Sequence, residues 1–336
     1  MLVDAIDRAV RKGRTNIVFN CPSETLYVAS ILKIHAVCDQ LADYQIKLFH
    51  VTGAFRGETT YSRMVDRLNL KGRRPTILAS NAQFTGFCRG HRSPEWMTLL
   101  STPFKAEIRA KKFLCFNRQH KGHRAYILAK FLESGLIKDA FFSFEGGFPN
   151  WIDDLTIYDW APIIREQFVK HKSIFPLRLN ITSERNNPVQ LEADDIKYHS
   201  NSYFSIVNET IFYENGLNRG QLGNAHPGIF LTEKVARPII LKHPFILSCM
   251  PYSLKALHYL GFKTFHPFID ESYDSEEDDD KRLDMIVAET ERLCKFTDEE
   301  WIQWQLNVSA IVEHNFNAIL NLHPHDHLNV ADYFKN

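Results

Sequence analysis

Residues 111–124 read KKFLCFNRQHKGHR and set the pattern for the rest of the chain. The apolar run 113–116 predicts a buried β-strand, and the spacing of apolar residues over 123–134 predicts a helix. A short polar loop rich in basic side chains joins the two. A strand that passes through such a loop into a helix begins the β–α unit from which parallel α/β sheets are built.

Short apolar runs and longer amphipathic segments alternate on both sides of this unit. Further strands are expected at residues 15–20, 45–51, 75–79, 140–144, 203–207 and 244–248, and further helices at 24–41, 59–68, 158–170, 232–241, 253–260, 279–294 and 297–320. The alternation predicts an α/β protein with two Rossmann-like, doubly wound domains. These domains would face a central cleft at the carboxyl ends of their strands, where such sheets bind ligands.

The charge of the chain is distributed unevenly. All 336 residues together hold 40 Lys and Arg against 40 Asp and Glu, but residues 1–125 hold 21 basic and 9 acidic side chains, an excess of 12 positive charges. A basic half attracts an anionic partner, such as the phosphates of a small ligand or of a nucleic acid. The alternative is a solvated surface without a partner.

The strand pattern and the sign of the charge both restart at residues 105–111. We therefore expect a first domain over 1–110, a second over 111–296, and a helix and tail over 297–336 that would pack back on the first domain. A length of 336 residues suits two domains of ordinary size.

The composition is typical of a globular protein with a sizeable core, since 44% of the residues are hydrophobic and 24% are charged. No apolar run approaches the roughly 20 residues that span a bilayer. The first ten residues lack the features of a signal peptide. The six cysteines are scattered without CxxC pairs, which favours reduced thiols. The expected location is the cytoplasm.

The loop after residue 116 collects side chains that favour an anion. Asn117, Arg118, His123 and Arg124 lie around the predicted start of a helix, at the carboxyl end of a strand. Unpaired N–H groups, the helix dipole and several cations together form an anion-binding site. The simpler interpretation is a solvated basic loop.

Residues 228–234 read GIFLTEK and end in a second candidate site. Thr232 is a favourable N-cap, so that Glu233 and Lys234 would occupy the first helical turn. A carboxylate there accepts hydrogen bonds from a ribose diol, and the ammonium beside it reaches a phosphate. Pro238 predicts a kink or a late helix start. A capping threonine followed by two ordinary first-turn charges is the alternative.

The segment from Phe230 through the TEK triplet to residues 243–247 (HPFIL) resembles the donor-site motif of the α1,3-fucosyltransferases. Those enzymes have the GT-B fold, in which two Rossmann-like domains face each other and the second holds a nucleotide sugar. A wider set of motifs is similar to a group of phage-encoded glycosyltransferases: FNR at 116–118 with His123 and Arg124, YFSIVNET at 203–210, LGFKTF at 260–265 and IDESYD at 269–274. The resemblance covers residues 111–295 and does not extend to residues 1–110.

The resemblance implies a GT-B-like glycosyltransferase that uses a UDP- or GDP-sugar and no further cofactor or metal. Glu233 would bind the donor ribose and Lys234 the diphosphate, while Arg118 and Arg124 would neutralise the departing diphosphate. The other residues expected in the donor site are Asn117, His123, Asn208, Glu209 and Thr232. Arg237 and Pro238 stand where fucosyltransferases have Asn-Ala, which puts fucose itself in doubt.

The first domain of such an enzyme binds the acceptor, and an inverting mechanism needs a general base there. Glu58, followed by Glu24, is the candidate, because both come after predicted strands at their carboxyl ends. We therefore expect an inverting, metal-independent hexosyl- or pentosyltransferase. The histidines of the tail, His323, His325 and His327, have a spacing that does not place metal ligands on one helix face.

Two classes of acceptor remain open. A hydroxyl on a modified base of phage DNA, such as hydroxymethylcytosine, fits the basic first half, and the phosphate contacts would be Lys71, Arg73, Arg74, Arg89 and Arg92. The enzyme would then act on double-stranded DNA in the cytoplasm of the host cell. A surface glycan or lipid-linked sugar is the alternative acceptor. A third hypothesis is a non-catalytic nucleic-acid-binding protein on a transferase scaffold.

Overall fold

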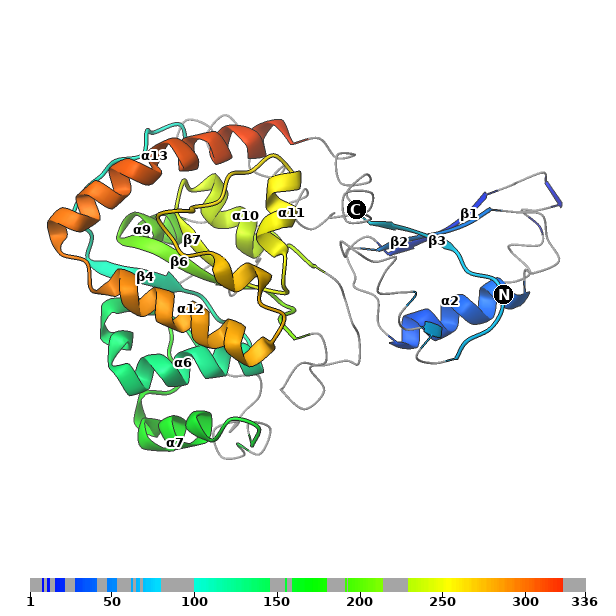
Figure 1. The fold of residues 1–336 in the computed structure, drawn as a ribbon, viewed down its shortest axis with the longest axis horizontal. Helices are drawn as coiled ribbons and strands as arrows, with labels where there is room; N and C mark the ends of the chain where they lie inside the picture. Colours follow the sequence, from blue (N-terminus) through cyan, green and yellow to red (C-terminus); the bar gives the residue numbers. More distant parts are fainter. Residues whose placement is uncertain are drawn as a thin grey trace.

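The computed structural model describes residues 8, 11–12, 16–21, 28–40, 47–52, 62, 65–66, 69–79, 100–145, 155, 159–179, 191, 193–213 and 229–322. Within these residues the chain is an α/β protein with two parallel sheets (Figure 1). The smaller sheet has the order β1 (Asn16–Cys21), β2 (Lys47–Thr52), β3 (Thr76–Ala79). The larger has the order β5 (Ala140–Phe142), β4 (Lys111–Cys115), β6 (Ser202–Asn208), β7 (Phe245–Ser248). The strands expected from the sequence are therefore confirmed, to within two residues at either end.

The helices also follow the expected pattern, with one addition. They are α2 (Val28–Gln40), α6 (Gly122–Ser134), α7 (Pro162–Lys170), α9 (Ala193–Ser200), α10 (Glu233–Ile240), α11 (Ser253–Tyr259), α12 (Asp279–Cys294) and α13 (Asp298–Asn321), with short 3-10 turns at Leu136–Asp139, Lys172–Ile174 and Ser272–Ser275. The sequence did not predict α9, because its eight residues ADDIKYHS are mostly polar. Most of the helix expected at 59–68 lies outside the described residues.

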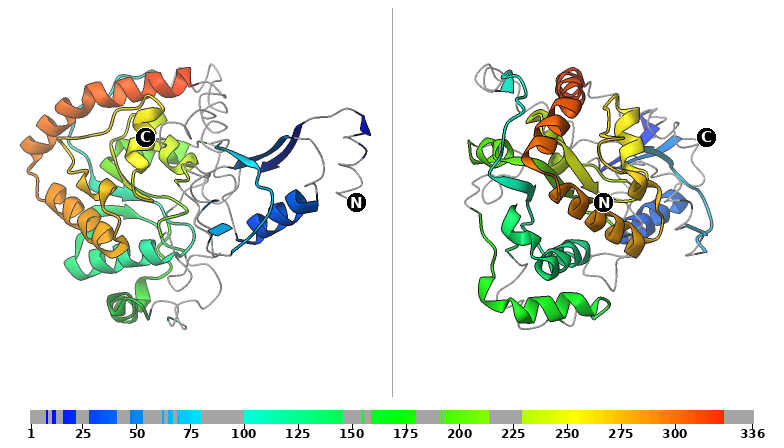
Figure 2. Two further views of the ribbon diagram at one scale, coloured as in Figure 1. Left: turned by 45° about the vertical axis from the view of Figure 1, so that its right-hand side comes forward. Right: turned by 60° about the vertical axis from the view of Figure 1, so that its left-hand side comes forward.

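The larger sheet is covered by helices on both faces. The chain passes from β4 to β5 in one direction across the sheet and from β6 to β7 in the other. Because such crossovers are right-handed, α6 and α10 lie on opposite faces. Helix α12 contacts α6 and β7, whereas α13 contacts α10 (Figures 1 and 2). The direction of winding reverses between β4 and β6, and sheets of this kind form a ligand crevice at that point.

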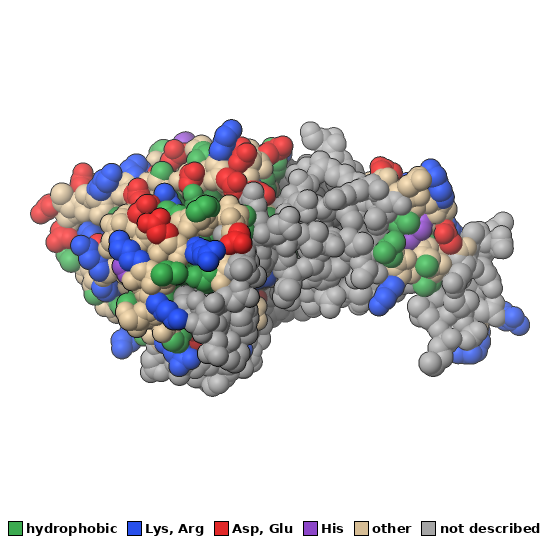
Figure 3. All heavy atoms as spheres, turned by 90° about the horizontal axis from the view of Figure 1, so that it is seen from below, with side chains coloured by type: hydrophobic (Ala, Val, Ile, Leu, Met, Phe, Trp, Pro, Cys, Tyr) green, Lys and Arg blue, Asp and Glu red, His purple; other side chains and the backbone are tan. Residues whose placement is uncertain are grey.

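The described surface around the larger sheet carries both positive and negative charges. Figure 3 shows acidic and basic side chains interspersed over the face that it presents. No helix in the described ranges combines the length and apolar character needed to cross a membrane.

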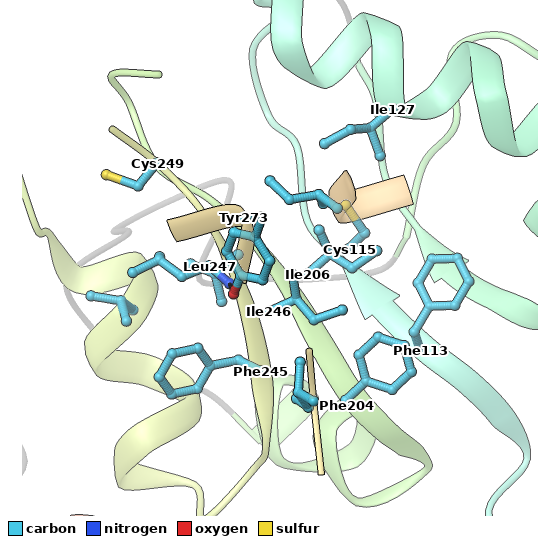
Figure 4. Packing of buried hydrophobic residues seen from close by; sticks show 14 of the residues in the cluster. Phe113, Cys115, Ile127, Phe204, Ile206, Phe245, Ile246, Leu247, Cys249 and Tyr273 are labelled. Atoms are coloured by element: carbon cyan, nitrogen blue, oxygen red, sulfur yellow. Dashed lines mark hydrogen bonds between the residues drawn. The ribbon is translucent and has the colours of Figure 1, made fainter. Parts of the chain in front are cut away.

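The core of the larger sheet is built from one aromatic side chain on each of three neighbouring strands (Figure 4). Phe113, Phe204 and Phe245 are at most 2% exposed. The rings of Phe113 and Phe204 stack at 5.8 Å between centroids. Parallel strands covered on both faces need such continuous apolar runs, which is why the sequence pattern located them.

Helix α13 closes the other side of this core. Thr297 and Glu300 form a capping box at its start. Trp301 is fully buried and stacks on Tyr203 at 4.1 Å. Glu313, further along the helix, accepts a hydrogen bond from the backbone N–H of Phe104 at 2.9 Å. The described part of residues 297–336 thus packs on the larger sheet and on the segment that leads into it.

The stack of Trp301 on Tyr203 supplies a test of this packing. Trp301→Ala should lower the free energy of unfolding by about 3–5 kcal/mol, because it leaves a cavity in the core. Leu306→Ala on the same helix removes a side chain that is 53% exposed, and should change stability by only about 0.5 kcal/mol. Chemical denaturation measures both, and equal effects of the two substitutions would contradict the packing described.

Candidate functional site

A pocket of about 210 Å³ lies where the winding of the larger sheet reverses, at the carboxyl ends of β4 and β6. The charged residues that line it are Arg118, Lys121, Arg124, Glu233, Lys234 and Arg237. The apolar residues that line it are Leu114, Phe116, Ile206, Val207 and Pro238. The other residues that line it are Gln119, His199, Ser205, Asn208 and Thr210. The lining thus combines five cations and one carboxylate with apolar side chains.

The start of α6 contributes the first cations. No side chain caps this helix at Lys121, so the N–H groups of its first turn remain directed at the pocket end of the helix. Burial, together with the charges of Arg124 and Lys234, lowers the pKa of Lys121 to about 8. Like charges thus lie near one another at this end of the helix, and a bound anion would relieve their repulsion.

The start of α10 contributes the second set of charges. Thr232 is the N-cap, as predicted, and its hydroxyl accepts a hydrogen bond from the backbone N–H of Lys234 at 3.3 Å. The ammonium of Lys234 lies 2.8 Å from a carboxylate oxygen of Glu233. Burial alone would raise the pKa of Glu233, but the charge and hydrogen bond of Lys234 outweigh it and hold the pKa low. Glu233 is therefore ionised and partly neutralises Lys234.

Glu209 connects the two sets from inside the protein. The buried carboxylate of Glu209 accepts two hydrogen bonds from Thr232. The backbone N–H of Thr232 donates one at 2.8 Å and the Thr232 hydroxyl donates the other at 2.7 Å. The backbone N–H of Thr210 donates to it at 3.2 Å. Burial raises the pKa of Glu209. The expectation that Glu209 lines the donor pocket is therefore replaced by a different role, because its oxygens are used in holding the first turn of α10.

The backbone carbonyl of Glu209 holds the start of α6. His123 Nε2 lies 3.1 Å and Arg124 Nη2 3.3 Å from this oxygen. Arg124 also donates to the carbonyl oxygen of Asn208 at 3.0 Å. The ring of His123 stacks on Phe212 at 5.1 Å, and burial with the charge of Arg124 holds the pKa of His123 well below its usual value. A neutral, buried His123 supports the site and does not neutralise an anion.

Asn117 also lies behind the pocket wall. It is fully buried, and its backbone N–H donates to Ser143 Oγ at 2.9 Å. Its side-chain oxygen accepts from Asn208 Nδ2 at 3.1 Å. Cys115 Sγ accepts from both amides at 3.2 Å. These contacts join the ends of β4 and β6 and fix the orientation of Asn208.

The pocket brings together five of the residues expected to bind the donor: Arg118, Arg124, Asn208, Glu233 and Lys234. Four others, Asn117, His123, Glu209 and Thr232, are not among its lining residues and support it from behind. Arg118 is exposed. The expected general bases Glu24 and Glu58, and the expected phosphate contacts Arg89 and Arg92, lie outside the described residues.

The other expected nucleic-acid contacts, Lys71, Arg73 and Arg74, precede β3 and so lie at the amino end of that strand. Arg74 forms a 3.4 Å ion pair with Asp66, and the backbone N–H of Arg73 donates to Asp39 at 3.2 Å. In a parallel sheet the amino ends lie on the edge opposite the ligand crevice. The three residues therefore lie at the end of the smaller sheet opposite the carboxyl ends of its strands, and their role as phosphate contacts stays a prediction.

Two residues that line the pocket were not predicted from the sequence to bind a ligand. Arg237 lies one helical turn after Glu233, so the i to i+4 spacing was a usable signal. Its Nε lies 3.6 Å from a carboxylate oxygen of Asp195. His199 stands on the unpredicted helix α9, and burial lowers its pKa to about 4. No periodic signal pointed to His199.

The described residues contain no group of three or more His, Cys, Asp or Glu side chains arranged to hold a metal ion. The tail histidines lie outside them. Comparison with models of protein families, with curated proteins and with solved structures gives no match to this chain. The resemblance to glycosyltransferases therefore rests on the sequence motifs, and the assignment to that group stays a prediction.

Proposed function

We propose that this protein transfers a glycosyl group from a nucleotide sugar to a hydroxyl group. The observation that carries the proposal is the charge of the pocket at the winding reversal. Among the described residues that line it, five are Lys or Arg and one is a carboxylate. Such an excess of cations, beside the starts of α6 and α10, suits a diphosphate. Glu233 supplies an acceptor for the ribose hydroxyls.

The reaction that we propose makes the diphosphate the leaving group. The bond between the anomeric carbon and the diphosphate oxygen breaks, and the electron pair stays on the diphosphate. Arg118, Arg124 and Lys234 stabilise that negative charge while the sugar passes through an oxocarbenium-like state. The acceptor oxygen forms the new bond to the anomeric carbon, and its proton passes to a general base. We keep Glu58, and after it Glu24, as the proposed bases of an inverting reaction.

The acceptor that we propose is a hydroxyl on a modified DNA base. The support is the excess of 12 positive charges over residues 1–125, because DNA attracts such a field at long range. Figure 3 shows Lys and Arg side chains among the described residues around the smaller sheet as well as among those around the larger sheet. A glycan acceptor remains the alternative, and it requires no affinity for DNA.

Removal of Lys234 tests the donor site. Lys234→Ala should weaken binding of pyrophosphate and of nucleoside diphosphates by roughly 10- to 100-fold, because it removes a charged hydrogen bond. The fold should persist, since Thr232 and Glu209 keep their hydrogen bonds. Lys263→Ala, which removes an exposed lysine elsewhere, is the matched control. Unchanged affinity of the Lys234 variant in calorimetry would remove the basis of the assignment.

The pKa of Lys121 predicts how binding depends on pH. Because this pKa is lowered to about 8, the ammonium is charged below that pH and loses its proton above it. Affinity for a nucleoside diphosphate, whose phosphates are ionised above about pH 7, should fall by several-fold as the pH rises from about 7 to 9. Lys121→Arg should flatten this profile, because arginine stays protonated. Identical profiles for both proteins would contradict the role of Lys121.

Replacement of Arg73 and Arg74 tests DNA as the acceptor. The double alanine variant should weaken binding to duplex DNA of every sequence and leave nucleotide binding intact. Affinity of the unaltered protein should fall steeply with salt, because each neutralised phosphate releases counterions. The matched control is the double variant Lys130→Ala and Arg165→Ala, which removes two positive charges from helices α6 and α7. Filter binding at low salt measures both, and no detectable DNA binding would favour the glycan acceptor.

A further inference from the structure

Helix α7 forms an outer layer of the protein. It packs on α6, which lies between α7 and the larger sheet (Figures 1 and 2). Ile164 and Phe168 are fully buried and join α7 to the hydrophobic core. Arg165, Val169 and Lys170 are exposed. One side of this helix therefore packs inward, and the other side faces solvent.

Two exposed hydrophobic side chains lie close together at the end of α7. Val169, in the last turn of the helix, is 62% exposed, and Ile174, in the 3-10 turn that follows, is 40% exposed. They are two of the five large hydrophobic side chains that are exposed among the described residues. Their chain neighbours Phe168 and Phe175 take the inward positions, with ring centroids 5.0 Å apart. Exposed hydrophobic side chains that gather at one place indicate a contact surface.

Basic side chains surround this hydrophobic pair. Residues 165–178 hold four Lys and Arg and one acidic residue, although the chain after residue 125 has an acidic excess. The four basic residues are exposed, and they are Arg165, Lys170, Lys172 and Arg178. Arg165 forms a 3.5 Å ion pair with Asp159, which reduces its contribution to the positive charge. We call the four basic residues, together with Val169 and Ile174, the α7 surface.

The α7 surface is placed where a flat partner can reach it. Helix α7 lies beyond α6 in both orientations of Figure 2, as it does in Figure 1. Figure 3 looks at the protein from the side on which α7 lies, and it shows basic and hydrophobic side chains beside one another on that face. A partner that is negatively charged at its surface and apolar beneath would complement both kinds of side chain.

We infer that the α7 surface binds an anionic lipid bilayer. Val169 and Ile174 enter the boundary between headgroups and acyl chains, while Lys170, Lys172 and Arg178 contact the anionic headgroups. A short amphipathic segment of this kind lies in the interface and does not cross the membrane. Each Lys or Arg near an anionic membrane surface strengthens binding by about fivefold. The inference goes beyond the proposed function and does not depend on it.

Two other partners fit the α7 surface less well. Duplex DNA would pair its phosphates with the cations, but its backbone offers nothing apolar to Val169 and Ile174. A stable protein–protein interface takes roughly 20–30 residues from each partner, many more than the α7 surface provides. A bilayer satisfies both the charge and the exposed hydrophobic side chains.

Binding of the full chain to lipid vesicles tests the inference. Vesicles of phosphatidylcholine alone are compared with vesicles that also contain phosphatidylglycerol, and the bound fraction is measured by sedimentation. The protein should bind the anionic vesicles at least about tenfold more tightly than the neutral ones. Binding should weaken as the salt concentration rises, because salt screens the attraction between the cations and the headgroups.

Variants separate the two parts of the α7 surface. Lys170→Ala with Lys172→Ala should weaken binding to the anionic vesicles by roughly 20-fold, at about fivefold for each charge. Val169→Ser with Ile174→Ser should weaken it by roughly tenfold, because less apolar surface leaves water on binding. All four side chains are exposed, so these variants should fold normally. Thermal unfolding checks this.

The matched controls change the same kinds of residue elsewhere. Lys263→Ala with Lys295→Ala removes two exposed charges that follow α11 and α12, and Leu306→Ser removes a side chain of α13 that is 53% exposed. Both controls should change vesicle binding by less than about twofold for the hydrophobic change, and by clearly less than the lysine pair of the α7 surface for the charge change.

Three results would overturn the inference. The first is no binding to anionic vesicles at low salt. The second is binding that the variants of the α7 surface leave unchanged, which would assign the attraction to the basic residues of 1–125. The third is a loss of duplex DNA binding, with vesicle binding intact, in the Lys170 and Lys172 variant, which would assign the α7 surface to nucleic acid.

Discussion

The buried carboxylate of Glu209 is the interaction on which the site depends. Its side chain holds Thr232, the cap of α10, and its backbone carbonyl holds His123 and Arg124 in the first turn of α6. One residue at the end of β6 thus fixes two helices that lie on opposite faces of the sheet. Burying a carboxylate is costly unless it is well bonded. Three hydrogen bonds to this carboxylate offset that cost.

The geometry of the sheet explains why charges gather at this place. The winding reverses between β4 and β6, so the segments that leave these strands diverge and leave a crevice. Both helices that begin there direct their N-terminal ends at the crevice, and Lys and Arg side chains add to the same positive field. Burial, and after it the charges of Arg124 and Lys234, lowers the pKa of Lys121. Such repulsion destabilises the folded protein, and it is retained where it serves binding.

The sequence motifs that resemble those of glycosyltransferases have different roles in the structure. The TEK triplet places Glu233 and Lys234 on the pocket wall. The motif IDESYD instead serves the scaffold: Asp274 accepts from the backbone N–H of Leu254 at 2.9 Å, and Tyr273 OH accepts from that of Leu247 at 3.1 Å (Figure 4). Burial raises the pKa of Asp274 to about 7. A motif in the sequence therefore marks a constrained position without saying whether a ligand or the protein itself imposes the constraint.

The sequence by itself determined the positions of the strands, most of the helices and the two loops that carry the cations. The reason is that buried parallel strands need unbroken apolar runs, and helix caps such as Thr232 act within a few residues. Only the tertiary structure decided which polar residues face the pocket. Asn208 and Glu209 are adjacent in the chain, yet one lines the pocket and the other is used inside the protein. That difference depends on partners more than 20 residues away, Asn117 and Thr232, whose positions no local pattern specifies.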